Sequence, residues 1–180
     1  MMFRRRSVFG PVALAAALVL AGGGATLSGG LGGSASAADA VPLAATAGCG
    51  KAPTLTSGPR TIQSGGQNRS FVLRIPANYN NNNPYRLIFG FHWNGGTMND
   101  VASGGTSGAA WAYYGMQEQS NNSAILVAPQ GNGNGWANPG GQDVTFIDDL
   151  LRQVEAALCV DTTQVFAGGF SYGGAMSYAL

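Results

Sequence analysis

The clearest pattern in this sequence is a series of short apolar runs separated by segments rich in Gly, Asn and Pro. Arg86–Phe91 and Ala124–Ala128 are almost continuously apolar, which is typical of strands buried on both faces of a sheet. Gln164–Ala167 is predicted to be a third such strand, and Arg69–Ile75 is predicted to be a strand that Pro76 ends. These four runs predict a sheet.

Helical periodicity appears between the apolar runs. In Asp143–Leu158 the apolar residues recur at the spacing of one helix face, and Asp143 stands where an N-cap or first-turn acid belongs. Two more helices are predicted, Ala109–Asn121 and Gly173–Leu180, and three segments are predicted to be loops: Gly48–Gly66, His92–Gly108 and Gln130–Gln142. Strands that alternate with helices in this way predict an α/β fold with a parallel, doubly wound sheet.

Residues 1–40 follow the order of a secretory signal peptide. A basic start, Met1–Arg6, precedes an apolar run, Val8–Ala21, and small residues with Ala-x-Ala cleavage sites come next. The apolar run is shorter than the ~20 residues of a membrane-spanning helix, so we expect cleavage and secretion rather than an anchor. Arg5–Arg6 fits a twin-arginine signal and an ordinary basic start, which leaves the export route open. Residues 41–180 are predicted to form one domain.

The composition narrows the kinds of partner. Charged residues make up only 9% of the sequence, against about a quarter in an average protein. The net charge is +1, so the protein has no basic field to hold nucleic acid or an anionic membrane. We therefore expect neutral extracellular partners, with no membrane contact after signal cleavage. No motif indicates a metal or a cofactor, and neither is expected.

The sequence contains two cysteines, Cys49 and Cys159. In an oxidising compartment an even count predicts an internal bridge, which would close a loop of about 110 residues. The sequence leaves open the alternative that each cysteine pairs with a partner outside this chain.

The sharpest chemical motif is Gly-x-Ser-x-Gly at Gly169–Gly173. The motif alone is weak, because 29 of the 180 residues are glycine. Its context strengthens it: a strand, Val165–Ala167, leads in and a helix leads away from Gly174, which is the setting of a nucleophile elbow. We therefore predict that Ser171 is a nucleophile.

The segment His92–Thr97 directly follows a buried strand, where hydrolases with this kind of elbow place an oxyanion donor. We predict that the backbone N–H groups of Tyr172 and Trp93 are the two donors, with Asn94 as the alternative to Trp93. A backbone donor does not depend on the side chain, which would instead shape the pocket.

His92 is the only histidine in the sequence. It precedes Ser171, whereas the catalytic triad of α/β-hydrolases runs Ser, acid, His along the chain, so we expect His92 to shape its loop rather than act as the base. The serine is also preceded by the acidic residues Asp143, Asp148, Asp149, Glu155 and Asp161. Of these, Asp148, Asp149 and Glu155 are expected on or near the solvated polar face of a helix. We therefore expect a nucleophile and an oxyanion hole without a base or an orienting acid, and close to no activity.

Trp136 and Asn94 lie in loops expected over the active site, and both are predicted to contact substrate. The rings of Trp93 and Trp136 could stack on a sugar or on an aromatic acyl group. Packing within the loops is the alternative for both rings.

Five segments in chain order resemble secreted feruloyl esterases and the related polyhydroxybutyrate-depolymerase-like esterases: Gly48–Lys51, Phe91–Gly96, Gly135–Asn138, Asp143–Asp148 and Gly168–Gly174. The resemblance implies an α/β-hydrolase with a doubly wound, mostly parallel sheet, truncated after the nucleophile elbow. It implies cleavage of hydroxycinnamoyl esters of plant arabinoxylan through an acyl-enzyme on Ser171, with Tyr172 as an oxyanion donor. It also implies an acid and a histidine beyond Leu180.

Other functions remain open at this point. An acetylxylan esterase, a polyester hydrolase like the polyhydroxybutyrate depolymerases and a secreted peptidase would all use the same fold. From another class, a non-catalytic carbohydrate-binding fragment would use Trp93 and Trp136, although such a module has no need of a nucleophile elbow. A gene fragment without a function of its own is the third alternative.

Overall fold

A mixed β-sheet forms the centre of the computed structural model, which describes residues 3–4 and 45–180. In these residues the sheet has six strands in the order β1-β6-β4-β5-β3-β2. The strands are β1 (Phe3–Arg4), β2 (Gly58–Ser64), β3 (Gln67–Arg74), β4 (Tyr85–Phe91), β5 (Ala124–Pro129) and β6 (Val160–Gly169). The α-helices are α1 (Met98–Ser103), α2 (Met116–Gln119), α3 (Gln142–Ala157) and α4 (Tyr172–Ala179). Apart from β1, the predicted signal peptide lies outside the described residues.

Strand direction changes across the sheet. β4 runs parallel to both β5 and β6, whereas β3 is antiparallel to β5, β2 is antiparallel to β3, and β1 is antiparallel to β6. The prediction of a mostly parallel sheet is therefore wrong, although the α/β class holds. The physical reason is a tight hairpin between β2 and β3, where Gly65 and Gly66 both take positive φ and reverse the chain in two residues.

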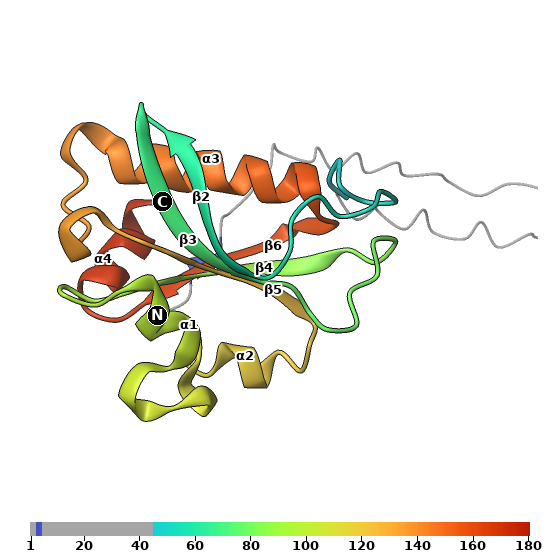
Figure 1. The fold of residues 1–180 in the computed structure, drawn as a ribbon, viewed down its shortest axis with the longest axis horizontal. Coiled ribbons are helices and arrows are strands. Elements are labelled where there is room, and N and C mark those ends of the chain that lie inside the picture. Colours follow the sequence, from blue (N-terminus) through green and yellow to red (C-terminus); the bar gives the residue numbers. More distant parts are fainter. Residues whose placement is uncertain (1–2, 5–44) are drawn as a thin grey trace, which may run out of the picture. The chain divides into compact units, whose positions relative to one another are not determined.

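Helices cover both faces of the sheet (Figure 1). Successive side chains of a strand point to opposite faces, so Leu87, Phe89 and Phe91 of β4 pack toward α3 and α4 while Ile88 packs toward α1 and the turn before α2. The first face carries the larger core, into which α3 inserts Phe146, Ile147, Leu150 and Val154. The second face is built on smaller residues and on Tyr113.

Two segments that are predicted to be loops contain regular secondary structure. The predicted loop Gly48–Gly66 contains β2, whose pairing with β3 orders a stretch that looks turn-rich in sequence. The predicted loop His92–Gly108 contains α1. This helix begins with a reciprocal capping box between Thr97 and Asp100. Both signals, the Gly65–Gly66 pair and the Thr-x-x-Asp spacing, are present in the sequence.

The predicted helix Ala109–Asn121 is wrong. Two short pieces, a 3₁₀ turn at Ala109–Trp111 and α2, are separated by Tyr113 and Tyr114, which both have positive φ. A helix cannot continue through left-handed residues. The backbone bends there because Tyr113 is buried in the core and the Tyr114 hydroxyl donates to the carbonyl of Phe91 at 2.6 Å.

The third predicted strand, Gln164–Ala167, is part of the longer β6. Val165, Phe166 and Ala167 are only half-buried, whereas every residue of β5 is buried. This difference in burial follows from position in the sheet. β5 lies between β4 and β3, whereas β6 lies between β4 and the two-residue strand β1.

A disulfide joins Cys49 to Cys159, which confirms the predicted internal bridge. It ties the start of the described domain to the junction of α3 and β6. The Thr46 hydroxyl donates to Leu158 O at 2.7 Å and accepts from Val160 N at 3.0 Å, so hydrogen bonds support the same junction.

We expect the double variant Cys49→Ser, Cys159→Ser to lose about 2–5 kcal/mol in the free energy of unfolding, because the bridge restricts a long loop in the unfolded chain. Guanidinium unfolding of the variant and of the oxidised chain measures this. Wild-type protein in a reducing agent is the control and should match the variant. An unchanged unfolding midpoint would contradict the prediction.

Candidate active site

Ser171 lies in the turn between β6 and α4 with a backbone conformation that few residues adopt. Its φ is 54° and its ψ is −118°, and its side chain is exposed. A non-glycine residue in this region is strained, and such strain persists only where surrounding structure imposes it. Ser171 is also the N-cap residue of α4, yet its hydroxyl makes no capping hydrogen bond. The hydroxyl is therefore displayed at the surface and available for chemistry.

The two glycines of the motif make this turn sterically possible. A Cβ on Gly169 would lie 2.6 Å from the Gly173 carbonyl carbon and 2.7 Å from Phe91 O, and a Cβ on Gly173 would lie 2.1 Å from Phe91 O. No side chain fits at either position without moving backbone. The elbow thus packs directly against the end of β4, where the predicted oxyanion loop, His92–Thr97, begins.

The predicted oxyanion donors lie on both sides of this contact. Tyr172 is the first residue of α4, where helix geometry leaves the N–H groups without intrahelical partners. Trp93 follows the strand end on the other side, and its ring folds back over its own loop, since a Cβ on Gly96 would lie 2.8 Å from Trp93 Cε2. The structure thus brings the turns that carry the two predicted donors together.

His92 is fully buried, and both of its ring nitrogens are engaged. Nδ1 lies 2.8 Å from the carbonyl oxygen of Trp93, which can only accept, so Nδ1 carries the proton. Nε2 then accepts from the backbone N–H of Gly131 at 2.9 Å. With neither nitrogen free, the ring cannot take a proton from Ser171, in agreement with the expectation that it shapes the loop.

Trp136 is packed inside its loop. Its side chain is 3% exposed, its ring lies edge-on to Phe91 with centroids 5.2 Å apart, and its Nε1–H donates to His92 O at 2.9 Å. A ring enclosed in this way has no face free for a sugar or an aromatic acid. The burial favours the packing alternative for Trp136, and substrate contact by this residue stays a prediction.

Asn94 is exposed near the elbow. Its Oδ1 lies 3.4 Å, and the ring of Tyr172 3.3 Å, from the position that a Cβ on Gly135 would take. Gly135 thus leaves room for the Asn94 side chain and for the ring of Tyr172, the residue that follows Ser171. This placement is compatible with substrate contact by Asn94, which stays a prediction.

A buried ion pair holds the loop that carries Trp136. Arg69 of β3 contacts Asp143 of α3 at 2.7 Å, and both side chains are almost completely buried. Asp143 also accepts from the backbone N–H of Asn138, whose own Oδ1 accepts from the first turn of α3. The guanidinium lies 4.2 Å from the centre of the Phe146 ring. Charge and ring contact together order the loop between β5 and α3.

Sequence reasoning did not find this ion pair. The signal is present, because Arg69 has the same parity along β3 as the core residues Phe71 and Leu73 and must therefore point inward. A buried arginine needs a partner, and an acid in the first turn of a helix is a natural one.

Two other acids that precede Ser171, Asp149 and Asp161, have structural partners. Asp149 accepts from the Ser64 hydroxyl at 2.7 Å, and hydrogen bonds from Ser64 and Arg152 hold its pKa below the ordinary value. Burial raises the pKa of Asp161, but hydrogen bonds from Thr163 and Gln164 outweigh it and lower the pKa overall. These contacts explain the two carboxylates without a catalytic role.

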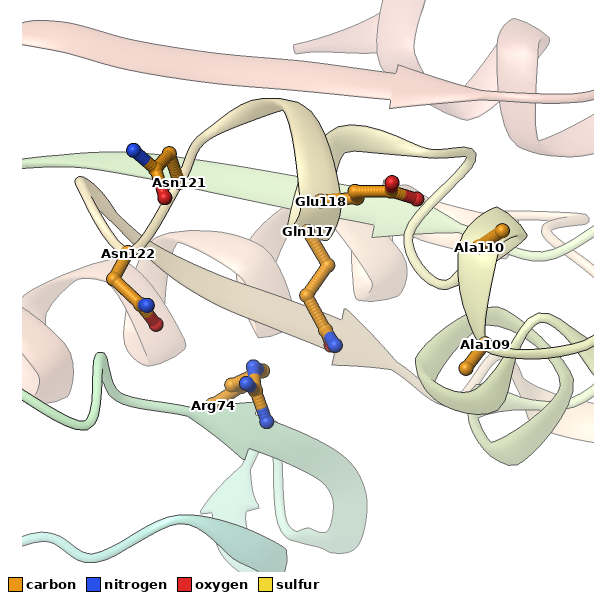
Figure 2. Close-up of a pocket in the computed structure, with 7 residues that line it drawn as sticks. All are labelled: Arg74, Ala109, Ala110, Gln117, Glu118, Asn121 and Asn122. Atoms are coloured by element: carbon orange, nitrogen blue, oxygen red, sulfur yellow. The ribbon is translucent and has the colours of Figure 1, made fainter.

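A separate polar pocket of about 320 Å³ lies between the end of β3 and α2 (Figure 2). Figure 2 shows the Arg74 guanidinium facing Gln117 across it, with Asn122 beside them. None of its lining residues belongs to the elbow or to the oxyanion loop. Within residues 3–4 and 45–180, no cluster of three or more His, Cys, Asp or Glu side chains is arranged to hold a metal. In the same residues no helix has the length and apolarity needed to cross a membrane.

We expect Asp143→Asn to lower the free energy of unfolding by about 3–5 kcal/mol, because it leaves the Arg69 charge buried without a counter-charge. The exposed pair Arg152–Asp149 provides the control, and Arg152→Ala should cost less than about 1 kcal/mol. Urea unfolding of both variants tests the difference, and equal losses would contradict it.

We expect the His92 ring to titrate below its ordinary pKa of 6.5, because burial disfavours the charged form more than the Trp93 carbonyl and Asp100 favour it. The unfolded chain then binds more protons than the folded one below pH 6.5, so His92's contribution to stability is complete above that pH and falls as the pH drops toward the folded pKa. NMR titration of this single histidine, with urea unfolding at about pH 7.5 and about pH 5.5, measures both effects. A ring that titrates at or above 6.5 would show that the lowered pKa is wrong.

Comparison with family models finds no match. Curated relatives include the probable feruloyl esterase C of Aspergillus flavus, 50% identical over 135 residues that cover 75% of this chain and 47% of the relative. Feruloyl esterase C of Emericella nidulans is 50% identical over 133 residues (74% and 47%), and feruloyl esterase D of Neurospora crassa is 46% identical over 150 residues (81% and 52%).

Solved structures share the fold. A ferulic acid esterase has a TM-score of 0.53 with 21% identity, over 68% of this chain and 52% of that chain. Native sOPH has a TM-score of 0.51 with 20% identity, over 71% and 47%. At these identities the likeness shows the fold alone. By sequence, the chain is homologous to the feruloyl esterases C and D, and it spans about half the length of these curated relatives.

Proposed function

We propose that this chain carries the nucleophile of a secreted serine esterase that cleaves hydroxycinnamoyl esters of plant arabinoxylan. The observation that supports this best is the conformation of Ser171, an exposed serine at φ 54° and ψ −118° between a strand and a helix, with glycines where side chains cannot fit. The names of the relatives support the ester class and the feruloyl group.

In the proposed reaction, Ser171 Oγ attacks the ester carbonyl and the sugar alcohol leaves with a proton, which forms an acyl-enzyme. Water then attacks the acyl group and releases the hydroxycinnamic acid. In both steps negative charge develops on the carbonyl oxygen, and the N–H groups of Tyr172 and Trp93 stabilise it. Donors already in place for that charge contribute roughly 10²–10³ each to the rate.

The same mechanism needs a base that these 180 residues do not supply. A serine hydroxyl is a weak nucleophile until a neighbour takes its proton. The one histidine of the sequence, His92, has both nitrogens engaged away from Ser171. We therefore propose that the histidine and its orienting acid come from sequence equivalent to the half of the relatives that this chain does not match.

Secretion is part of the proposal. It is supported by the basic and apolar start of the sequence and by the Cys49–Cys159 disulfide, since stable disulfides are typical of oxidising compartments. A carbohydrate-binding module is not favoured, because the Trp136 ring is enclosed and cannot stack on a sugar.

We expect the 180-residue chain to hydrolyse methyl ferulate and aryl acetates no faster than its Ser171→Ala variant, since the base is missing. A completed form, which adds the sequence equivalent to the unmatched half of the relatives, should hydrolyse methyl ferulate with a dependence on Ser171 of at least about 10³.

Each alternative has its own outcome in the same assay. Ser171-dependent turnover by the 180-residue chain would require His92 or another group present to act as base. A completed, folded form without Ser171-dependent turnover on any ester would refute the proposed function. Preference for aryl acetate would favour an acetylxylan esterase, and preference for a short polyester would favour a polyester hydrolase.

A further inference from the structure

Buried side chains donate hydrogen bonds to the carbonyl oxygens of two consecutive peptide groups in the oxyanion loop, the His92–Trp93 and Trp93–Asn94 peptides. The His92 carbonyl accepts from Trp136 Nε1–H at 2.9 Å. The next carbonyl, that of Trp93, accepts from His92 Nδ1–H at 2.8 Å and from the N–H of Gly96 at 3.0 Å. The first two donors are buried side chains, so both peptide planes are fixed by groups inside the protein.

Fixing these carbonyls also fixes the adjacent N–H groups. In a trans peptide the C=O and the N–H point in opposite directions, and the described chain contains no cis peptide bond. The His92 carbonyl points toward Trp136, so the N–H of Trp93 points away from it. The Trp93 carbonyl points toward the His92 ring, so the N–H of Asn94 points away from that ring. Both candidate donors thus turn away from the groups that hold the loop.

The holding groups are themselves fixed. The His92 ring accepts at Nε2 from Gly131 at 2.9 Å, and its centre lies 4.8 Å from that of the Trp136 indole. Trp136 is in turn packed edge-on against Phe91. The His92 ring, just after β4, and the Trp136 ring, in the loop after β5, therefore support each other. Neither of these two rings can turn without losing a buried hydrogen bond.

The His92 carbonyl and the Phe91 carbonyl before it lie against the elbow. A Cβ on Gly173 would be 2.1 Å from Phe91 O and 2.8 Å from His92 O, so the oxyanion loop and the first turn of α4 are in backbone contact. Tyr114 donates to Phe91 O at 2.6 Å and holds this contact from the other side. The relative placement of the Trp93 and Tyr172 N–H groups is thus set by this junction.

We propose that Trp136 and the Nδ1-protonated His92 are positioning residues of the oxyanion hole. Trp136 orients the Trp93 N–H through the His92 carbonyl, and the His92 ring orients the N–H of Asn94, the alternative donor, through the Trp93 carbonyl. The inference rests on the proposed function, because an oxyanion hole has a role only in acyl transfer. Trp136 never touches the substrate; it acts through the His92 peptide. His92 acts through its ring proton and not as a base.

The first test compares Trp136→Phe with Trp111→Phe in the completed, ester-hydrolysing form. Phenylalanine keeps an aromatic ring but removes the Nε1–H, so the His92–Trp93 peptide loses its support. Trp111 is 61% exposed, so it is the matched control. We expect Trp136→Phe to lower kcat at least about tenfold with KM little changed, because an oxyanion donor acts on the transition state rather than on substrate binding. Trp111→Phe should leave both constants unchanged.

The second test needs no activity. His92 is the only histidine of the 180-residue chain, so ¹⁵N-histidine labelling gives one pair of ring signals. We expect the neutral ring to carry its proton on Nδ1, and we expect the amide signals of Trp93 and Asn94 to shift in Trp136→Phe but not in Trp111→Phe. This readout also decides the question if Trp136→Phe is too unstable for kinetics, because the wild-type tautomer is measured without the variant.

The outcomes separate the inference from the function. A proton on Nε2 overturns the positioning role whether or not the protein is an esterase. In an active completed form, an unchanged kcat in folded Trp136→Phe overturns it as well. A proton on Nδ1 together with no Ser171-dependent turnover in the completed form refutes the proposed function and, with it, any catalytic meaning of the arrangement. Loss of kcat at unchanged KM, with the proton on Nδ1, supports both.

Discussion

The carbonyl groups of Phe91 and His92 pass so close to Gly173 that a side chain there would overlap both of them. This contact joins the end of β4 to the first turn of α4, and Gly169 permits the same approach from β6. Between the two glycines Ser171 is left in a strained conformation with its hydroxyl exposed. The candidate site therefore depends first on backbone packing, and the side chains around it serve to keep that packing in place.

Buried polar contacts carry most of that support. Only 9% of the residues are charged, yet Arg69 and Asp143 form an ion pair in the interior. In a low-dielectric interior such a pair is costly to break, and its hydrogen bonds to the loop between β5 and α3 order a segment rich in glycine and asparagine. That loop supplies Trp136 and the Gly131 N–H, which hold His92. The Arg69–Asp143 pair thus orders the loop between β5 and α3, and this loop in turn holds His92 and the peptide group that follows it.

Prediction from the sequence succeeded where a pattern is long or where two independent signals agree. The periodicity of α3 and the apolar runs of β4 and β5 lie within a residue or two of the observed elements. Prediction failed where a contact distant in sequence decides the local conformation. The segment around Tyr113 looks helical by spacing, but burial of that ring and the Tyr114–Phe91 hydrogen bond impose left-handed backbone instead. β2 has no strong strand signal and is ordered by pairing with β3.

The sequence by itself determined the local chemistry: a serine flanked by glycines after a strand and before a helix, two cysteines in a chain with the pattern of an exported protein, and one histidine in the wrong chain order for a base. Local motifs carry such information because strand, turn and helix are set by neighbouring residues. Only the tertiary structure decided which groups the His92 and Trp136 side chains bind, and that the sheet is mixed. Those outcomes depend on which groups meet across the fold, and a hydrogen bond between residues about forty positions apart leaves no periodic trace in the sequence.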